Sequence, residues 1–200
     1  MSGIINQTGS RSGTIGRTEG GFTKMLAQSS LGTGEFYQVF TGGFGQYHVV
    51  ISNLTPTTDD VAFYLRLLNT ADGVISTSDY RQSTGGSYNN SGGTSNDQVR
   101  GLWNGSRWEI TPAGANVGSG NDRGMHATLT FYNPLSTKFY CYVSGLVVMM
   151  SQAGASIRTS HFSGVYNSGT AAAGFKLYPS SGSLAQGQVS VYGMGLPDLA

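Results

Sequence analysis

Short apolar runs separated by clusters of Gly, Ser, Asn and Pro make up the chain from about Phe36 onward. In residues 61–68 apolar side chains alternate with other types, and residues 125–132 repeat this alternation. A period of two places alternate side chains on one face of an extended strand, so both segments are predicted to be strands with one buried face. The two predicted buried sets are Val61, Phe63, Leu65, Leu67, Met125, Ala127, Leu129 and Phe131.

Further apolar runs predict more strands at 47–54, 139–150, 161–166, 175–178 and 189–193, and a short strand or hairpin at 103–110 around Asn104-Gly105. The run at 139–150 is the most apolar, which predicts a central position in its sheet. The runs at 175–178 and 189–193 are predicted to pair with each other. The polar stretch 81–94, rich in Gly, Ser and Asn, predicts a long exposed loop.

No window of the chain has a convincing helical period, and the predicted strands are short and joined by irregular loops. This pattern is typical of an antiparallel β-sandwich and not of parallel strands with helical crossovers. The sequence therefore predicts an all-β, jelly-roll-like antiparallel β-sandwich in residues 36–200. Residues 1–35 lack this texture and are predicted to form an extended, Gly-rich N-terminal arm.

The arm contains nearly the same phrase twice, SGIINQT and SGTIGRT, with an isoleucine at the same place in each. It lacks the charge of a solvated tail and the basic and apolar regions of a secretory signal. A docking arm that becomes ordered on a partner fits these features best. The candidate docking residues are Ile4, Ile5 and Ile15.

Composition restricts the partners. The net charge is +1 and no block of like charges is present, which argues against nucleic-acid binding. No apolar run is long enough for a membrane span. The single cysteine, Cys141, permits no internal disulfide and lies in an apolar run, where a buried core thiol is expected. Only 10% of residues are charged, which indicates a surface covered in part by neighbours.

Candidate catalytic and metal-binding groups lack a recognisable arrangement. Asp59 and Asp60 are adjacent, so in an extended chain their side chains point apart, unlike the paired carboxylates of a glycosidase. The histidines lie in three separate strands without a ligand spacing such as H-x-x-x-H, and the amide and acidic pairs at 96–97 and 121–122 lack the spacing of a calcium loop. The three histidines are His48, His126 and His161. We expect no enzyme activity, no metal and no cofactor.

Large aromatic side chains lie in or beside the predicted loops, where they would suit a contact surface because Tyr and Trp give large contact areas at small entropic cost. The alternative is that they pack beneath the loops. The candidates are Tyr80, Tyr88, Trp103, Trp108 and Tyr166.

Both ends of the chain resemble those of small virion structural proteins of tailed bacteriophages, particularly phages of marine bacteria. The opening SGIINQTGSRSGTIG resembles their N-terminal stretch, and the closing YPSSGSLAQGQVSVYG is similar to their C-terminal pattern. The resemblance covers the two ends and no motif between them. It implies a jelly-roll-like sandwich, commonly a trimer, mounted on the capsid or tail, and it implies no catalytic residues.

Three hypotheses for function follow. The first is a capsid decoration or cement protein on the virion surface, a homotrimer bound to the major capsid protein through its arm. The second is a tail fibre, knob or receptor-binding protein, bound to tail or adaptor proteins. The third is a carbohydrate-binding or glycan-degrading sandwich that recognises a host surface glycan. A sandwich fold by itself cannot choose among them.

Overall fold

The computed structural model describes residues 22–30, 34–41, 43–90, 95–111, 117–120, 123–150 and 156–197, and these residues contain strands but no helix. The all-β prediction is therefore confirmed. The strands are β1 (Phe22–Ser30), β2 (Phe36–Val39), β3 (Phe44–Pro56), β4 (Phe63–Leu68), β5 (Tyr80–Asn90), β6 (Ser95–Gly105), β7 (Trp108–Glu109), β8 (Met125–Tyr132), β9 (Cys141–Met150), β10 (Ser156–Tyr166), β11 (Gly174–Pro179) and β12 (Leu184–Pro197).

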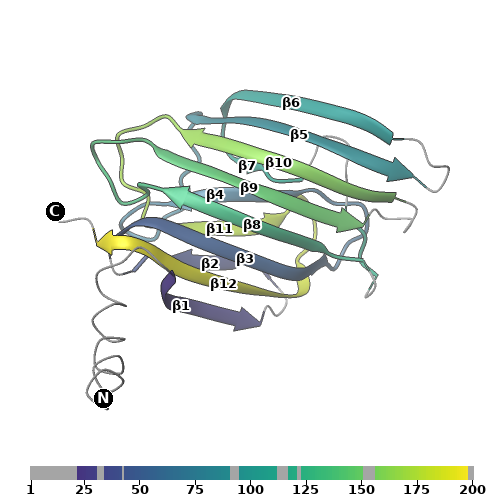
Figure 1. Ribbon diagram of the computed structural model, residues 1–200, viewed down its shortest axis with the longest axis horizontal. Coiled ribbons are helices and arrows are strands. Elements are labelled where there is room, and N and C mark those ends of the chain that lie inside the picture. The colour runs from purple at the N-terminus through teal and green to yellow at the C-terminus, as the bar shows by residue number, and fades with distance from the viewer. Residues whose placement is uncertain are drawn as a thin grey trace, which may run out of the picture.

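Two antiparallel sheets of unequal size face each other (Figure 1). The large sheet has eight strands in the order β1-β12-β3-β8-β9-β10-β5-β6, and the small sheet has four in the order β2-β11-β4-β7. In Figure 1 the large sheet lies in front and the small sheet behind it. The predicted antiparallel sandwich is confirmed.

The core lies between the two inner faces and is rich in aromatic rings. Phe131 of β8 stacks on Phe175 of β11, with ring centroids 5.3 Å apart and an interplanar angle of 20°. Phe40 meets Phe131 edge-on at 5.2 Å and lies 4.4 Å from the Tyr47 ring. Each of these rings is buried. Because large buried rings contribute much of the hydrophobic free energy, this group joins the two sheets firmly.

A buried glutamine of the large sheet links it to β7, the edge strand of the small sheet. Gln82 of β5 donates from Nε2 to the carbonyl oxygen of Glu109 at 3.1 Å and accepts from the Glu109 backbone N–H at 2.7 Å. The amide thus pairs with the β7 backbone as another strand would, and it satisfies polar groups that would be costly to bury unpaired.

The alternation predicted in 61–68 and 125–132 is confirmed, because all eight side chains assigned to the core are buried. Strand β9 lies between β8 and β10, away from both edges of the large sheet, as predicted from its apolar run. Cys141 is buried, as expected for a core thiol, and burial raises the pKa of its thiol.

The predicted exposed loop at 81–94 is wrong. Residues up to Asn90 belong to β5 and residues from Ser95 belong to β6, and these strands pair along their length. Their Gly and Asn residues disfavour strands on intrinsic propensity alone. Strand pairing overrides that preference here, because β5 is hydrogen-bonded on both sides, to β10 and to β6.

Two local pairings were also predicted wrongly. The first is the hairpin around Asn104-Gly105, which does not form. Asn104 has a left-handed φ of 59°, but the chain leaves the large sheet there, so β6 pairs with β5 while β7 pairs with β4. The second is the pairing of the runs at 175–178 and 189–193, which lie in β11 and β12 and do not pair with each other. Strand β11 pairs with β2 and β4, and strand β12 pairs with β1 and β3. Neighbours in sequence are thus divided between the sheets, because each inner face needs its own apolar strands.

Part of the segment assigned to the arm lies in the large sheet. Residues Phe22–Ser30 form the edge strand β1, which pairs with β12. The candidate docking residues Ile4, Ile5 and Ile15 lie outside the described residues. The docking role of residues 1–35 stays a prediction.

Two adjacent glycines of β5 provide a test of the packing. A Cβ at Gly86 would overlap the Thr159 carbonyl oxygen and lie 3.0 Å from Ser160 Cα, whereas a Cβ at Gly85 would meet nothing within 4 Å. We expect Gly86→Ala to lower the free energy of unfolding by about 1–3 kcal/mol, since backbone must move. Gly85→Ala should leave it unchanged or raise it by up to about 1 kcal/mol. Urea denaturation of both variants checks this, and equal effects would contradict the β5–β10 packing.

Candidate functional site

The outer face of the small sheet carries charged and aromatic side chains that pair with one another. Lys176 Nζ lies 2.7 Å from a Glu35 carboxylate oxygen, which also accepts from the Tyr37 hydroxyl at 2.7 Å. Burial opposes the charge on Glu35, but Lys176 and Tyr37 outweigh it and hold the pKa of that carboxyl below its ordinary value. Lys176 and Arg66 both lie over the Tyr178 ring. This face is a self-paired, polar surface.

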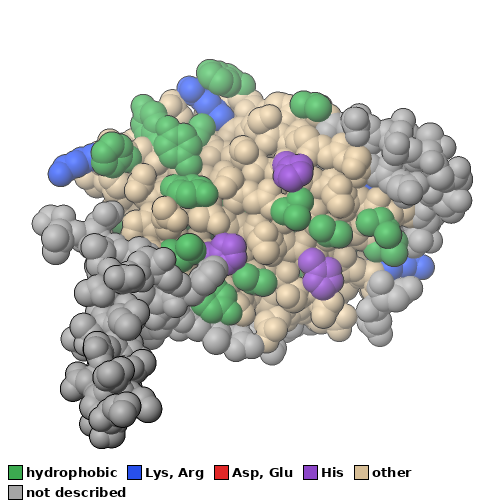
Figure 2. All heavy atoms as spheres, viewed as in Figure 1, with side chains coloured by type: hydrophobic (Ala, Val, Ile, Leu, Met, Phe, Trp, Pro, Cys, Tyr) green, Lys and Arg blue, Asp and Glu red, His purple; other side chains and the backbone are tan. Residues whose placement is uncertain are grey.

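The outer face of the large sheet is different in kind. One cross-strand row of outward residues is mostly small and hydroxyl-bearing, and we call it the hydroxyl row: His48, Thr130, Ser144, Ser163, Ser83 and Gly101. Exposed apolar side chains flank this row (Val99, Trp103, Tyr142 and Leu146), and the exposed Ile157 lies farther along β10. In the view of Figure 2, no Asp or Glu side chain is seen among the described residues of this face.

All three histidines lie on this outer face (Figure 2). Each is level with a different residue of β9: His48 with Ser144, His161 with Leu146, and His126 with Val148. Among the described residues, no group of three His, Cys, Asp or Glu side chains is placed to hold a metal ion. His48 Nδ1 is 3.1 Å from the Thr130 hydroxyl, and burial lowers the pKa of its imidazole.

One corner of this face combines aromatic and cationic groups, and we call it the Trp103 corner (Arg81, Trp103 and Tyr142). The Arg81 guanidinium lies 3.9 Å from the centre of the Trp103 ring. A shallow hollow of about 370 Å³ runs from these groups past Tyr142, over a floor that includes Ser83 and Ser163. Trp103 is 70% exposed, so most of its ring is open to contact.

A second hollow forms where β3 bulges, and we call it the bulge pocket. The β3–β8 register shifts between Ile51 and Leu54, and Asn53 within this shift has a left-handed φ of 51°. A glycine lies on each side of the bulge. A Cβ at Gly187 of β12 would lie 3.1 Å from Leu54 Cα, and one at Gly124 would lie 3.5 Å from the Asn53 carbonyl carbon. The first distance is tighter than most Cβ contacts, so glycine at position 187 leaves room for the bulge, whereas the second is ordinary van der Waals contact.

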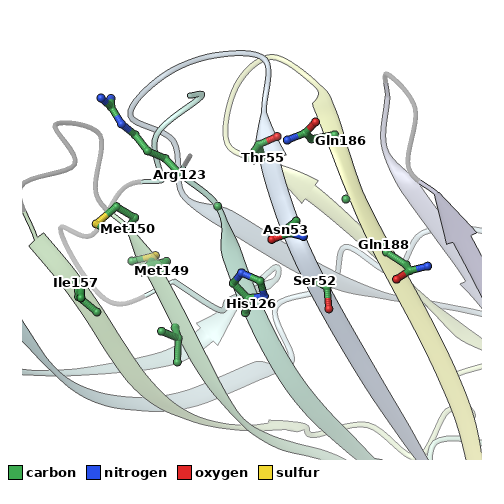
Figure 3. A pocket seen from close by; sticks show the side chains of 13 residues that line it. Ser52, Asn53, Thr55, Arg123, His126, Met149, Met150, Ile157, Gln186 and Gln188 are labelled. Atoms are coloured by element: carbon green, nitrogen blue, oxygen red, sulfur yellow. The ribbon is translucent and has the colours of Figure 1, made fainter. Parts of the chain in front are cut away.

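The bulge pocket has a volume of about 660 Å³ and a polar and an apolar side (Figure 3). Strands β3, β8 and β12 supply the polar side chains: Ser52, Asn53, Thr55, His126, Gln186 and Gln188. Strands β9 and β10 supply the apolar side chains Val148, Met150 and Ile157, and the buried core residue Met149 also borders the pocket. Arg123 lines the rim, and Figure 3 shows its guanidinium directed away from Asn53, Ser52 and His126.

Most of the aromatic residues proposed as loop contacts are in the core, which corrects that prediction. Tyr80, Trp108 and Tyr166 are buried, and the ring of Tyr80 lies 5.0 Å from that of Trp108 and 5.1 Å from that of Tyr166. Trp103 is exposed, as a contact residue must be. Tyr88 lies in β5, but its side chain is outside the described part of the structure. The alternative of packing beneath the loops therefore holds for three of the five.

The buried Tyr80 and Trp108 find polar partners, as amphipathic rings in a core require. The Tyr80 hydroxyl donates to the Ile75 carbonyl at 2.9 Å and accepts from the Leu67 backbone N–H at 2.9 Å. Burial raises the pKa of this hydroxyl well above its ordinary value. Trp108 Nε1–H donates to the Arg81 carbonyl at 3.0 Å, so the core supports the strand that carries the Trp103 corner.

Two of the described carboxylates are engaged away from both hollows. Glu109 accepts from Arg100 at 2.7 Å, and Asp59 accepts from the Ser119 backbone N–H at 2.7 Å. Neither pocket lining includes an Asp or Glu among the described residues. Chemically, the outer face of the large sheet offers hydrogen bonds, apolar contact and stacking, which are the means of binding.

Comparison with known proteins found no family model and no curated protein that matches this sequence. Within the described residues, no helix has the length and apolar character that crossing a membrane requires.

The buried Tyr80 hydroxyl can be tested against an exposed one. Tyr80→Phe leaves the Leu67 N–H and the Ile75 carbonyl without their partner, so we expect it to lower the free energy of unfolding by about 1–3 kcal/mol. Tyr142→Phe removes an exposed hydroxyl and should change that free energy by less than about 0.5 kcal/mol. Chemical denaturation checks both. A Tyr80→Phe variant as stable as Tyr142→Phe would contradict the bridging role.

Proposed function

We propose that this chain is a structural protein of a bacteriophage virion that works by docking, and that it decorates the capsid as a homotrimer on the major capsid protein. The observation that carries the docking role is the contrast between the two outer faces. One face satisfies its charges internally. The other is uncharged over most of its described surface and exposes Trp, Tyr, Leu, Ile and Val side chains.

The composition of the large sheet's outer face suits a protein interface. Trp, Tyr and Arg are the residues most enriched at interface hot spots, and the Trp103 corner contains one of each. The hydroxyl row beside it consists mainly of small side chains, which allow a partner surface to approach closely. Because few charges must be desolvated, covering this face costs little. Exposed apolar patches of this kind mark interaction sites.

The resemblance of both chain ends to virion proteins of tailed phages supports the particle as the partner. Capsid and tail locations differ in copy number, since decoration requires hundreds of copies per virion and a tail fibre or knob only a few. Quantitative mass spectrometry of purified virions would separate the two. A binding role requires no catalytic residues.

A matched pair of edge-strand valines tests the docking face. Val99 of β6 is 82% exposed on the outer face of the large sheet, and Val39 of β2 is 37% exposed on the small sheet. We expect Val99→Glu to weaken attachment to virions at least tenfold, because a carboxylate would be buried at the interface. Val39→Glu should leave attachment within about twofold. Co-sedimentation with virions that lack the protein measures this.

The Trp103 corner provides the second variant of the same experiment. Trp103→Ala should weaken attachment by at least about tenfold, as truncation of a hot-spot residue does. Circular dichroism establishes that each variant is folded. If Val99→Glu and Trp103→Ala attach as well as the Val39→Glu control, the large sheet's outer face is not the docking surface.

The arm requires its own test. Deleting residues 1–20 removes none of the described strands, because β1 begins at Phe22. We expect the shortened protein to keep its cooperative unfolding transition and to lose attachment to the particle. Replacing Ile5 and Ile15 with Ser in the full-length chain should have the same effect. A deletion variant that unfolds, or one that still attaches, would contradict the docking arm.

A further inference from the structure

We infer that the bulge pocket is a binding site for a neutral saccharide. This inference does not rest on the proposed virion role, because it follows from the pocket's own construction. The volume of about 660 Å³ is within the range of roughly 300–1,000 Å³ typical of small-molecule sites.

Three strands are adapted locally to form this pocket. Asn53 holds a left-handed conformation that costs free energy for a residue with a side chain, and such outliers concentrate at functional sites. Gly187 has a φ of 150°, which favours glycine, and Gly124 faces the bulge from the other side. A regular strand at this place would pair more fully with its neighbours, so the bulge sacrifices ladder hydrogen bonds and opens the hollow.

The polar side of the pocket matches the hydroxyl groups of a sugar. A sugar hydroxyl is both a donor and an acceptor, and so are the amides of Asn53, Gln186 and Gln188. The hydroxyl of Ser52 and the imidazole of His126 add groups of the same dual character. Figure 3 shows Asn53, Ser52 and His126 side by side on neighbouring strands.

The apolar side matches the other half of a sugar ring. A pyranose presents one face of C–H groups, which gains free energy when it leaves water against apolar side chains. Val148, Met150 and Ile157 form such a wall opposite the amides, and Ile157 is largely exposed. A purely apolar ligand would leave the amide side without hydrogen bonds, which is costly.

The charge of the lining favours a neutral ligand. No Asp or Glu is among the described lining residues, so nothing there would pair with a cationic ligand. The Arg123 guanidinium points away from the amide and imidazole groups, so it is not placed over the pocket floor (Figure 3). At the pocket floor an acidic sugar would bring its carboxylate to uncharged side chains, and there it would lose hydration without a charged partner.

Binding can be followed through the methionines of the lining. Protein labelled with ¹³C at the methionine methyl groups is titrated with neutral oligosaccharides (maltohexaose, cellohexaose, mannohexaose and chitohexaose) up to about 10 mM, a range that detects millimolar affinity. We expect at least one of them to shift the Met150 methyl signal in a saturable manner. The acidic probes oligogalacturonate and sialyllactose should bind at least tenfold more weakly.

Matched variants assign the effect to the pocket. His126 lines the pocket, whereas His161 is an exposed histidine on the same face outside its lining. His126→Ala should weaken binding at least tenfold and His161→Ala less than twofold, a difference of about 1.4 kcal/mol per factor of ten. Asn53→Gly should also weaken it, since glycine keeps the left-handed backbone and removes only the amide.

The inference fails on any of three results. The first is the absence of a saturable Met150 shift with every neutral probe. The second is tighter binding of an acidic probe than of any neutral one. The third is equal loss of affinity in the His126→Ala and His161→Ala variants. None of these results would affect virion attachment by the Trp103 corner, so the two proposals are tested separately.

Discussion

The stacked contact between Phe131 and Phe175 joins two sheets whose strands each give one face to the core. Since side chains alternate along a strand, every residue that packs inward fixes its neighbours as outward. The inward set of β8 ends in Phe131, and its outward set therefore includes Thr130 in the hydroxyl row and His126 in the bulge pocket. Burial of one face thus positions the surface on the other, although that surface contributes little to the core.

The inequality of the two sheets separates two kinds of surface. On the small sheet's outer face the charged groups pair with one another and with neighbouring tyrosines, as Glu35 and Lys176 do. The large sheet's outer face is broader and mostly uncharged, with aromatic and arginine groups at the Trp103 corner and amides at the bulge pocket. A division of this kind suits a protein that turns one side to solvent and the other to a partner. It is the physical basis of the docking proposal.

Regular alternation made part of this structure predictable. The alternation in residues 61–68 and 125–132 predicts which faces are buried, and the apolar run at 139–150 predicts a central strand. The Gly- and Ser-rich strand β5 gives no such signal, because its stability comes from pairing with β10 and β6. Burial of Tyr80 and Trp108 depends on the same missed strands. The bulge pocket had a local sign in Asn53, a poor strand former two residues after the apolar run 49–51, but the glycines that flank it are distant in sequence.

Oxidative footprinting of the two tryptophans tests the docking account most directly, because one of them is exposed and the other is buried. In the isolated protein, hydroxyl radicals should oxidise the exposed Trp103 and spare the buried Trp108, which serves as the internal control. In assembled virions, the account predicts that Trp103 becomes protected to the level of Trp108. Equal oxidation of Trp103 in the free and assembled protein would contradict it.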